Sequence, residues 1–241
     1  SNEDLLHRLK SHVVLQPEIS ASSSLAKLLE MMMDKHVICF TIILLVSGLG
    51  NGMIETFLFV RLDEMGASGT LLGISRLLMC LGEIPFFHYN DLLIHHIGVF
   101  GVLALVQAAY IVRFTTYSVM THPWQVLPIE ALHGLTFASL WATSCYYAHI
   151  IAPPKLEASA QSIINVIHWG VGFTGGNIIG GIVWSEYGPI RMFQLGIALV
   201  SLTFLLAILT KVAFGERSTG TGAEEQDYRA VNTETFDVPT E

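Results

Sequence analysis

The sequence predicts an all-α integral membrane protein, a bundle of six transmembrane helices. Hydrophobic residues make up 52% of its 241 residues and charged residues only 13%, and its mean hydropathy is +0.56. A soluble domain carries about a quarter charged residues, so most of this chain cannot form a water-exposed surface. The charges are also unevenly placed, since residues 1–35 and 215–241 hold 18 of the 32 Asp, Glu, Lys and Arg side chains. The apolar stretch between these two segments is therefore expected to lie in a membrane.

Six apolar windows in this stretch are each long enough to cross a bilayer. A hydrocarbon core of about 30 Å needs about 20 residues of α-helix, because backbone groups in lipid must hydrogen-bond within their own segment. Short connectors rich in turn-forming residues separate the windows. The first connector holds Gly66 and Gly69, the second holds Asn90 and Asp91, and the others carry proline or glycine at 122–123, 153–154 and 188–189. The predicted helices cover about residues 36–60, 69–89, 96–117, 124–150, 156–184 and 189–214.

Polar segments flank the predicted bundle on both sides. Residues 1–35 are interpreted as a cytosolic linker, although Leu25, Leu28 and Leu29 could form one face of a short amphipathic helix. Residues 215–241 combine Gly, Ser, Thr and acidic residues without periodicity, which predicts a disordered, acidic cytosolic tail.

The orientation of the bundle follows from its lysines and arginines. Short connectors make consecutive helices antiparallel, so these residues can be counted on alternate sides of the membrane. Eight fall on the side of the two chain ends and three on the other, with Arg76 left out because it lies inside a span. By the positive-inside rule, both ends of this chain are predicted to be cytosolic.

Composition and motifs argue against several classes of function. The net charge of −8 argues against nucleic acid as a partner. Cys39, Cys80 and Cys145 lie in apolar stretches and are odd in number, which indicates small buried hydrophobes rather than a disulfide or zinc framework. No motif for a metal, a phosphate loop, a catalytic nucleophile or a dinucleotide occurs, so neither metal nor cofactor is expected and an enzyme is not favoured.

Five charged side chains fall inside the predicted spans. A charge near the bilayer centre is costly, so such residues usually face a cavity, a partner or the end of the span. Glu83 is the strongest candidate for function, because it lies about four turns into its span and shortly before the helix-kinking Pro85. Structural and functional roles fit equally for the two residues within about two turns of a span end, Glu55 and Arg113. The five residues are Glu55, Arg76, Glu83, Arg113 and Glu130.

Spacing along the helices indicates which of these groups can pair. Arg76 and Glu83 share a face but are about 10 Å apart, so the partner of Arg76 must come from another helix or from a solute. Glu130 and His133 are three residues apart on one face. Because histidine titrates near physiological pH, this pair fits either a structural hydrogen bond or a proton relay. An acid–base pair in an intramembrane enzyme is a third, weaker interpretation.

Glycines mark a predicted packing surface on the fifth span. Gly172, Gly176 and Gly180 recur every four residues, which aligns them on one helix face and allows another helix to approach closely. His168 lies on the same face, where a structural hydrogen bond is preferred to ligand binding.

Five segments of the predicted spans and connectors form a recognisable pattern. They are LGEIPFF at 81–87, VRFTTYS at 112–118, HPWQVLPIEALHGLTFASLWA at 122–142, IAPPKLEASAQ at 151–161 and GGNIIGGIVWSEYG at 175–188. Together they resemble the C-terminal half of a major facilitator superfamily transporter. The sequence is similar to the branch named major facilitator superfamily domain-containing protein six, and more distantly to lactose permease. The likeness covers nearly all of residues 36–214 and is most specific around 122–161. It implies a twelve-helix protein whose two six-helix halves rock about a midplane site.

The resemblance to lactose permease implies roles for individual residues. Glu83 is similar to the sugar-binding glutamate, Arg113 to the arginine needed for proton release, and His133 to the histidine that joins the two functions. Glu55 matches an acidic residue of the first helix only approximately. Two positions depart from the pattern, since Glu130 stands where that family has a lysine, and Thr136 where it has a proton-carrying glutamate.

The sequence thus predicts a solute transporter that works by alternating access, for a small polar solute such as a sugar, with proton symport left open. Its expected partners are the lipid bilayer, the solute, a proton and the N-terminal six-helix half of the same protein. A membrane receptor or scaffold that keeps the carrier fold without transporting is the alternative, and the two departures around His133 favour it. The candidate solute or proton pathway consists of Glu55, Arg76, Glu83, Arg113, Glu130 and His133.

Overall fold

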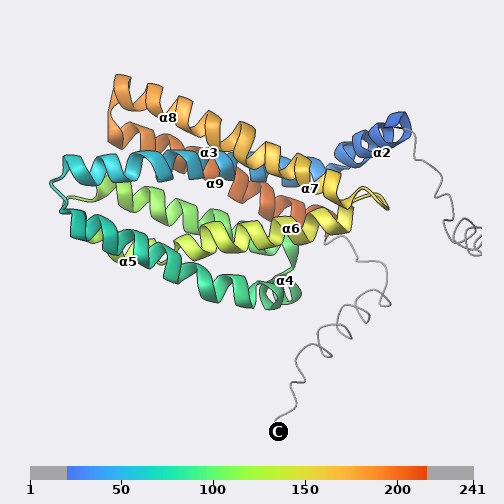
Figure 1. The fold of residues 1–241 in the computed structure, drawn as a ribbon, viewed down its shortest axis with the longest axis horizontal. Helices are drawn as coiled ribbons and strands as arrows, with labels where there is room; N and C mark the ends of the chain where they lie inside the picture. Colours follow the sequence, from blue (N-terminus) through green and yellow to red (C-terminus); the bar gives the residue numbers. More distant parts are fainter. Residues whose placement is uncertain (1–20, 216–241) are drawn as a thin grey trace, which may run out of the picture.

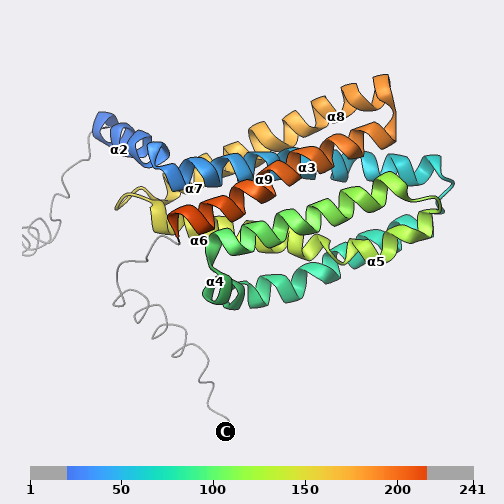
Figure 2. The same cartoon turned by 180° about the vertical axis from the view of Figure 1, so that it is seen from behind.

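The computed structural model describes residues 21–215, and every regular element in that range is a helix. The all-α prediction is therefore confirmed. Long helices lie side by side in one elongated bundle, and helix α2 projects from one of its ends (Figures 1 and 2). The elements are α2 Ala21–Met33, α3 Lys35–Glu64, α4 Gly69–Val119, the 3₁₀ helix η1 Pro123–Val126, α5 Leu127–Glu130, the π-helix η2 Gly134–Ser139, α6 Leu140–Ile151, α7 Glu157–Asn165, the π-helix η3 Val166–Phe173, α8 Thr174–Tyr187 and α9 Pro189–Phe214.

Within the described range, four helical stretches are long and apolar enough to cross a membrane by length and composition: Lys35–Glu64, Gly69–Val119, Glu157–Tyr187 and Pro189–Ala213. Helix α2 occupies part of the segment interpreted as a linker. The predictions made for residues 1–20 and 216–241 lie outside the described residues.

Helix α4 contains two antiparallel segments rather than one rod. Its 51 residues are interrupted at Gly98, which has φ 69° and ψ 172°, a conformation that glycine adopts without steric cost. The chain doubles back there (Figures 1 and 2). The reversal was expected at Asn90 and Asp91, but these residues are helical, and the buried Asn90 amide donates to Thr143 Oγ1 at 3.1 Å. The polar amide thus stays inside the bundle because a second helix supplies its partner.

Local sequence explains where the long helices begin. Asp34 caps α3, its carboxylate accepting a hydrogen bond from the His36 amide at 2.8 Å. Ser68 caps α4 in the same way, accepting from the Leu71 amide at 3.3 Å. Helix α9 starts with Pro189, whose missing amide hydrogen costs nothing in the first turn.

Small residues set a close helix contact between α3 and the η3–α8 stretch. A Cβ added to Gly48 would lie 3.0 Å from the Gly172 Cα, and one added to Gly176 would overlap the Leu49 carbonyl. A Cβ added to Gly180 would lie 2.9 Å from Cε2 of Phe57, which is also on α3. The predicted glycine face of the fifth span therefore lies against α3 at all three positions, against its backbone at the first two and against a side chain at the third.

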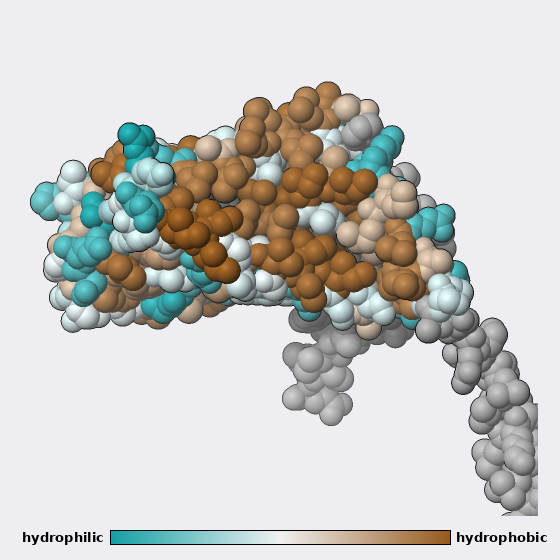
Figure 3. Space-filling view, turned by 90° about the horizontal axis from the view of Figure 1, so that it is seen from above, coloured by the Kyte–Doolittle hydropathy of each residue, from teal (hydrophilic) through white to brown (hydrophobic). Residues whose placement is uncertain are grey.

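The surface matches a chain surrounded by lipid. Apolar side chains form a broad band over the view in Figure 3, while hydrophilic residues gather toward one end. Large hydrophobic residues on α9 are strongly exposed, including Leu202, Leu209 and Val212. Exposed apolar area of this extent is rare on soluble monomers and is expected where the surrounding solvent is hydrocarbon.

Candidate functional site

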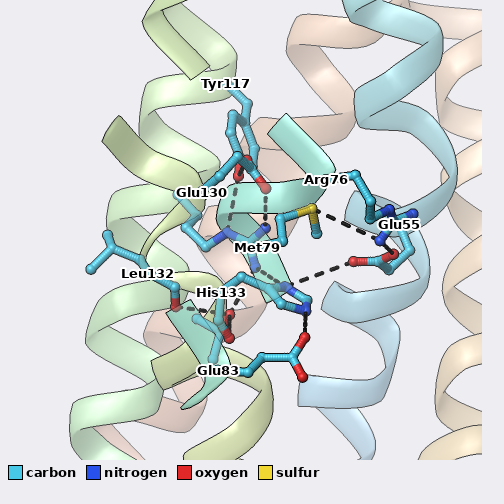
Figure 4. A network of polar contacts seen from close by, with 10 residues as sticks. Glu55, Arg76, Met79, Glu83, Tyr117, Glu130, Leu132 and His133 are labelled. Atoms are coloured by element: carbon cyan, nitrogen blue, oxygen red, sulfur yellow. Dashed lines mark hydrogen bonds and ion pairs between the residues drawn. The ribbon is translucent and has the colours of Figure 1, made fainter. Parts of the chain in front are cut away.

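A connected group of polar side chains lies within the bundle (Figure 4). Three stretches of chain supply it: α3, the two segments of α4, and the region from α5 to the start of η2. We call it the polar network, and it comprises Glu55, Arg76, Glu83, Arg113, Tyr117, Glu130, His133 and Thr136.

Arg113 forms the buried centre of the polar network. Its side chain is 0% exposed, and so is that of Glu130, whose Oε2 lies 3.3 Å from Arg113 Nη2. Arg113 also donates from Nε to the Tyr117 hydroxyl at 2.9 Å and from Nη1 to Thr136 Oγ1 at 2.7 Å. The Tyr117 hydroxyl in turn donates to Glu130 Oε1 at 2.6 Å. A buried charge pair is tolerated when further hydrogen bonds satisfy its remaining donors and acceptors, as they do here.

His133 joins this centre to the outer part of the network. Its Nδ1 lies 3.2 Å from Arg113 Nη1, and its Nε2 lies 3.4 Å from Glu83 Oε1. Because a guanidinium can only donate, Nδ1 acts as the acceptor, and the ring proton belongs on Nε2, facing Glu83. Nδ1 also lies 3.8 Å from Glu55 Oε1. One imidazole thus touches both carboxylates and the central arginine.

The outer edge of the network is a second ion pair, which lies at the surface of the bundle. Arg76 Nη1 donates to Glu55 Oε2 at 2.9 Å, and 51% of the Arg76 side chain is exposed. Its guanidinium carbon also lies 4.9 Å from the centre of the Phe59 ring, within the range of a cation–π contact. Arg76 was expected to take its partner from another helix or from a solute, and Glu55 on α3 is that partner.

Close backbone contact holds the two helices that carry Glu83 and His133. A Cβ added to Gly82 would lie 2.7 Å from the Ala131 carbonyl oxygen, and one added to Gly134 would overlap the Gly82 carbonyl. These two glycines immediately precede and follow the paired residues in sequence. The distance between the Glu83 carboxylate and the His133 ring is therefore set by a glycine–glycine crossing.

The charges of the network do not cancel. It holds three carboxyl groups, Glu55, Glu83 and Glu130, and two guanidinium groups, Arg76 and Arg113. With every carboxyl group ionised and the imidazole neutral, one negative charge is left over. One proton, or one cationic group of a solute, would neutralise it. Within residues 21–215, no group of three or more His, Cys, Asp and Glu side chains is placed to hold a metal ion.

The six residues singled out from the sequence all come together in this network, although they lie on different helices. Tyr117 was not among the residues predicted from the sequence, although it is four residues after Arg113 and so on the same helix face. Thr136 was predicted only as a departure from a family pattern, and its hydroxyl accepts a hydrogen bond directly from Arg113. The remaining candidate, His168, lies elsewhere and places its Nδ1 3.3 Å from the Leu44 carbonyl oxygen, as a structural histidine would.

Comparison with known proteins identifies the family. The sequence profile described as the MFS_1 like family matches residues 4–195. The chain belongs to this family. It is 24% identical over 179 residues to the human major facilitator superfamily domain-containing protein 6-like, which covers 74% of this chain and 30% of that protein.

Two bacterial members of the wider group are also similar. The uncharacterized transporter YwbF of Bacillus subtilis is 25% identical over 154 residues, covering 62% of this chain and 39% of that protein. The maltose permease of Geobacillus stearothermophilus is 22% identical over 173 residues, covering 71% and 42%. The chain spans 30% or less of the length of its similar proteins from human, mouse and Xenopus laevis. Membership in a family of multi-pass membrane transporters accounts for the apolar helices described above.

Proposed function

We propose that this chain is half of a major facilitator-type transporter that carries a small polar solute such as a sugar by alternating access, coupled to a proton. In this proposal the chain supplies six spans, about 36–60, 69–89, 96–117, 124–150, 156–184 and 189–214, with both ends cytosolic. A second six-helix half of the same protein would face the polar network across the transport pathway. The single observation that carries the proposal is the polar network itself.

The exposure of the polar network supports a pathway that solute can reach. Side-chain exposure rises from 0% at Arg113, through 6% at His133, to 25% at Glu83 and 51% at Arg76. A purely structural cluster would be expected to be buried throughout or to lie at a span end. In this one, buried ionisable groups connect without interruption to groups that a solute can touch.

The acceptors at the accessible edge suit hydroxyl groups. Glu83 is part-exposed and, among residues 21–215, meets only the His133 ring within ion-pair distance, so its carboxylate retains acceptor capacity. Glu55 Oε1 is buried and has no hydrogen-bond partner in the described part of the chain, which is costly unless a donor arrives. Two neighbouring sugar hydroxyl groups, one donating to each carboxylate, would satisfy both. The similarity to a maltose permease agrees with this class of solute.

The uncompensated negative charge supports coupling to a proton. A charge inside a membrane protein is expensive, so the network is more stable when a proton or a cationic group neutralises it. The His133 ring is the natural site of transfer, because it contacts Glu83, Glu55 and the Arg113 guanidinium. Glu130 stays paired to Arg113 and Tyr117 in the buried centre, where it fixes the arginine.

The test is uptake into proteoliposomes that contain the full-length protein. Radiolabelled glucose, galactose, lactose and maltose would be offered with and without an inward proton gradient. Uptake of at least one sugar, increased by the gradient, is expected, and the Glu83→Gln variant should lose it while unfolding at the same temperature. Glu64→Gln is the matched control, since it removes a carboxylate of the exposed pair at the end of α3.

Each possible outcome of this test has a definite meaning. Normal uptake by Glu83→Gln would overturn the role of the polar network. Uptake that is equal with and without the proton gradient would contradict proton coupling but not sugar transport. No uptake of any sugar by a correctly folded protein would contradict the sugar transporter and favour the alternative, a receptor or scaffold that keeps the carrier fold.

A further inference from the structure

Four aromatic side chains form a continuous cluster beside the polar network. Phe137 and Trp169 have ring centres 6.1 Å apart and meet edge to face. Trp169 also contacts Trp141 at 6.0 Å and Phe173 at 5.4 Å. We call Phe137, Trp141, Trp169 and Phe173 the aromatic cluster. Its geometry is the edge-to-face and tilted packing that aromatic quadrupoles favour.

The aromatic cluster is joined directly to the charged groups. The Phe137 ring is stacked on the His133 imidazole, with centres 5.4 Å apart and planes within 11° of parallel. The Nε2 edge of the same imidazole faces Glu83. A solute bound at Glu83 would therefore lie within reach of both the carboxylate and the rings, which makes the aromatic cluster a continuation of the polar network.

Trp169 has many neighbours and yet remains accessible. Its ring contacts Phe137, Trp141, His168 and Phe173, and 38% of the residue is still exposed. A tryptophan used only for packing would normally lose nearly all of its surface, because burying this large ring is where its stabilising effect comes from.

Phe137, which stacks on His133, and Trp169, which contacts Phe137, both lie in π-helices. Phe137 is in η2 and Trp169 in η3. Short π-helical stretches are uncommon and cluster at functional sites, because the widened turn changes the direction in which side chains project. Beside Trp169, the imidazole of His168 is buried, and its Nε2 has no hydrogen-bond partner among the residues that the structure describes. An unpaired buried nitrogen next to an accessible ring is what a site prepared for a polar solute would contain.

We propose that Trp169 and Phe137 form a stacking subsite that selects solutes with a flat apolar face next to hydroxyl groups. The inference rests on the proposed transport function and narrows its substrate class. The C–H face of a pyranose ring would lie against the Trp169 ring, and hydroxyl groups on its edge would donate to Glu83. Aromatic faces supply apolar contact and a negative electrostatic potential, which suits polarised C–H groups.

The first test needs no solute. In the full-length protein in vesicles, the fluorescence of Trp169 is obtained as the difference between the wild type and Trp169→Phe. The subsite requires this difference signal to be quenched by acrylamide in water and not by brominated phospholipid. Quenching by the lipid alone, or by neither, would overturn the proposal, because the ring would then face the bilayer or be covered by protein. Trp184→Phe gives the reference signal, because the Trp184 ring on α8 packs between the rings of Phe57 and Phe193.

The second test uses uptake of radiolabelled maltose, glucose and galactose. Trp169→Leu should raise the apparent KM of the transported sugar about tenfold, equivalent to about 1.4 kcal/mol. Trp169→Phe, which keeps a ring, should recover most of the loss, and Trp184→Leu should leave the apparent KM unchanged. Uptake by the wild type with an unchanged KM in Trp169→Leu would refute the subsite and spare the transporter. No uptake by the folded wild type would overturn the transporter and the subsite with it.

Discussion

Replacing Gly134 by alanine tests whether the glycine–glycine crossing sets the contact between Glu83 and His133. The added methyl group would overlap the Gly82 carbonyl and would lie 2.7 Å from Phe86 Cδ2. Carbon atoms in contact sit about 3.5–4.0 Å apart, so the two helices must separate by at least about 1 Å. The 3.4 Å distance from His133 Nε2 to Glu83 Oε1 would then grow to at least about 4.4 Å, beyond hydrogen-bonding reach.

The expected loss of activity follows from this displacement. A misplacement of about 1 Å at a reacting or binding group can cost about 100-fold in rate, so uptake by Gly134→Ala should fall by roughly this factor. Overpacking of a close contact also costs about 1–3 kcal/mol of stability, which would lower the unfolding temperature measurably. The assay combines uptake into proteoliposomes with thermal unfolding of the same purified protein.

Gly73→Ala on α4 is the matched control, because a Cβ at Gly73 meets no atom within 4 Å. It should keep full uptake and should be slightly stabilised, since alanine is favoured over glycine in a helix by about 0.5–1 kcal/mol. Normal uptake and an unchanged unfolding temperature in Gly134→Ala would show that the two helices are not held by this crossing. The glycine–glycine crossing would then not be what positions His133 against Glu83.

Three further predictions concern the stability of the bundle. Arg113→Ala should lower the free energy of unfolding by about 3–5 kcal/mol, because Glu130 would stay buried without its arginine. The double variant with Glu130→Ala should lose less stability than Arg113→Ala alone, as measured by thermal unfolding. Gly176→Ala should separate α3 from α8 and lower the unfolding temperature by several degrees, whereas Gly181→Ala, with its nearest contact at an ordinary 3.6 Å, should not. Lys211→Met removes the hydrogen bond to the carbonyl at the α4 break and should cost about 1–3 kcal/mol, with faster hydrogen exchange at the amides just after the break.

The sequence was informative about which residues matter and where the membrane lies. Hydropathy alone indicates a multi-span bundle, because a lipid surface leaves a strong compositional signal. Charged residues inside apolar spans are rare enough that Glu55, Glu83 and Arg113 could be selected without knowing any contact. The four-residue glycine spacing likewise predicted the helix face that lies against α3, since period and face are linked in a helix.

Other features depend on contacts between helices and could not be predicted. Asn90 and Asp91 look like a turn, but a hydrogen bond from the Asn90 amide to Thr143, 53 residues away, allows the helix to continue past them to Gly98. The pairing of Arg76 with Glu55 required knowing how α3 lies against α4. The π-helices around Phe137 and Trp169 leave no clear sequence signal, because the same residues are compatible with an ordinary α-helix.

The buried pair of Arg113 and Glu130 has a consequence for how the chain enters the membrane. The two residues lie on consecutive helical stretches joined only by residues 120–122. An unpaired arginine adds up to about 2.5–3.5 kcal/mol to the insertion cost of a segment when it is at the centre, and less toward an end, where Arg113 lies. Inserted together as a hairpin, residues 99–151 bring a neutral pair into the bilayer instead of two separate charges. The smallest unit that the insertion machinery can release into lipid at low cost is therefore this hairpin rather than either helix.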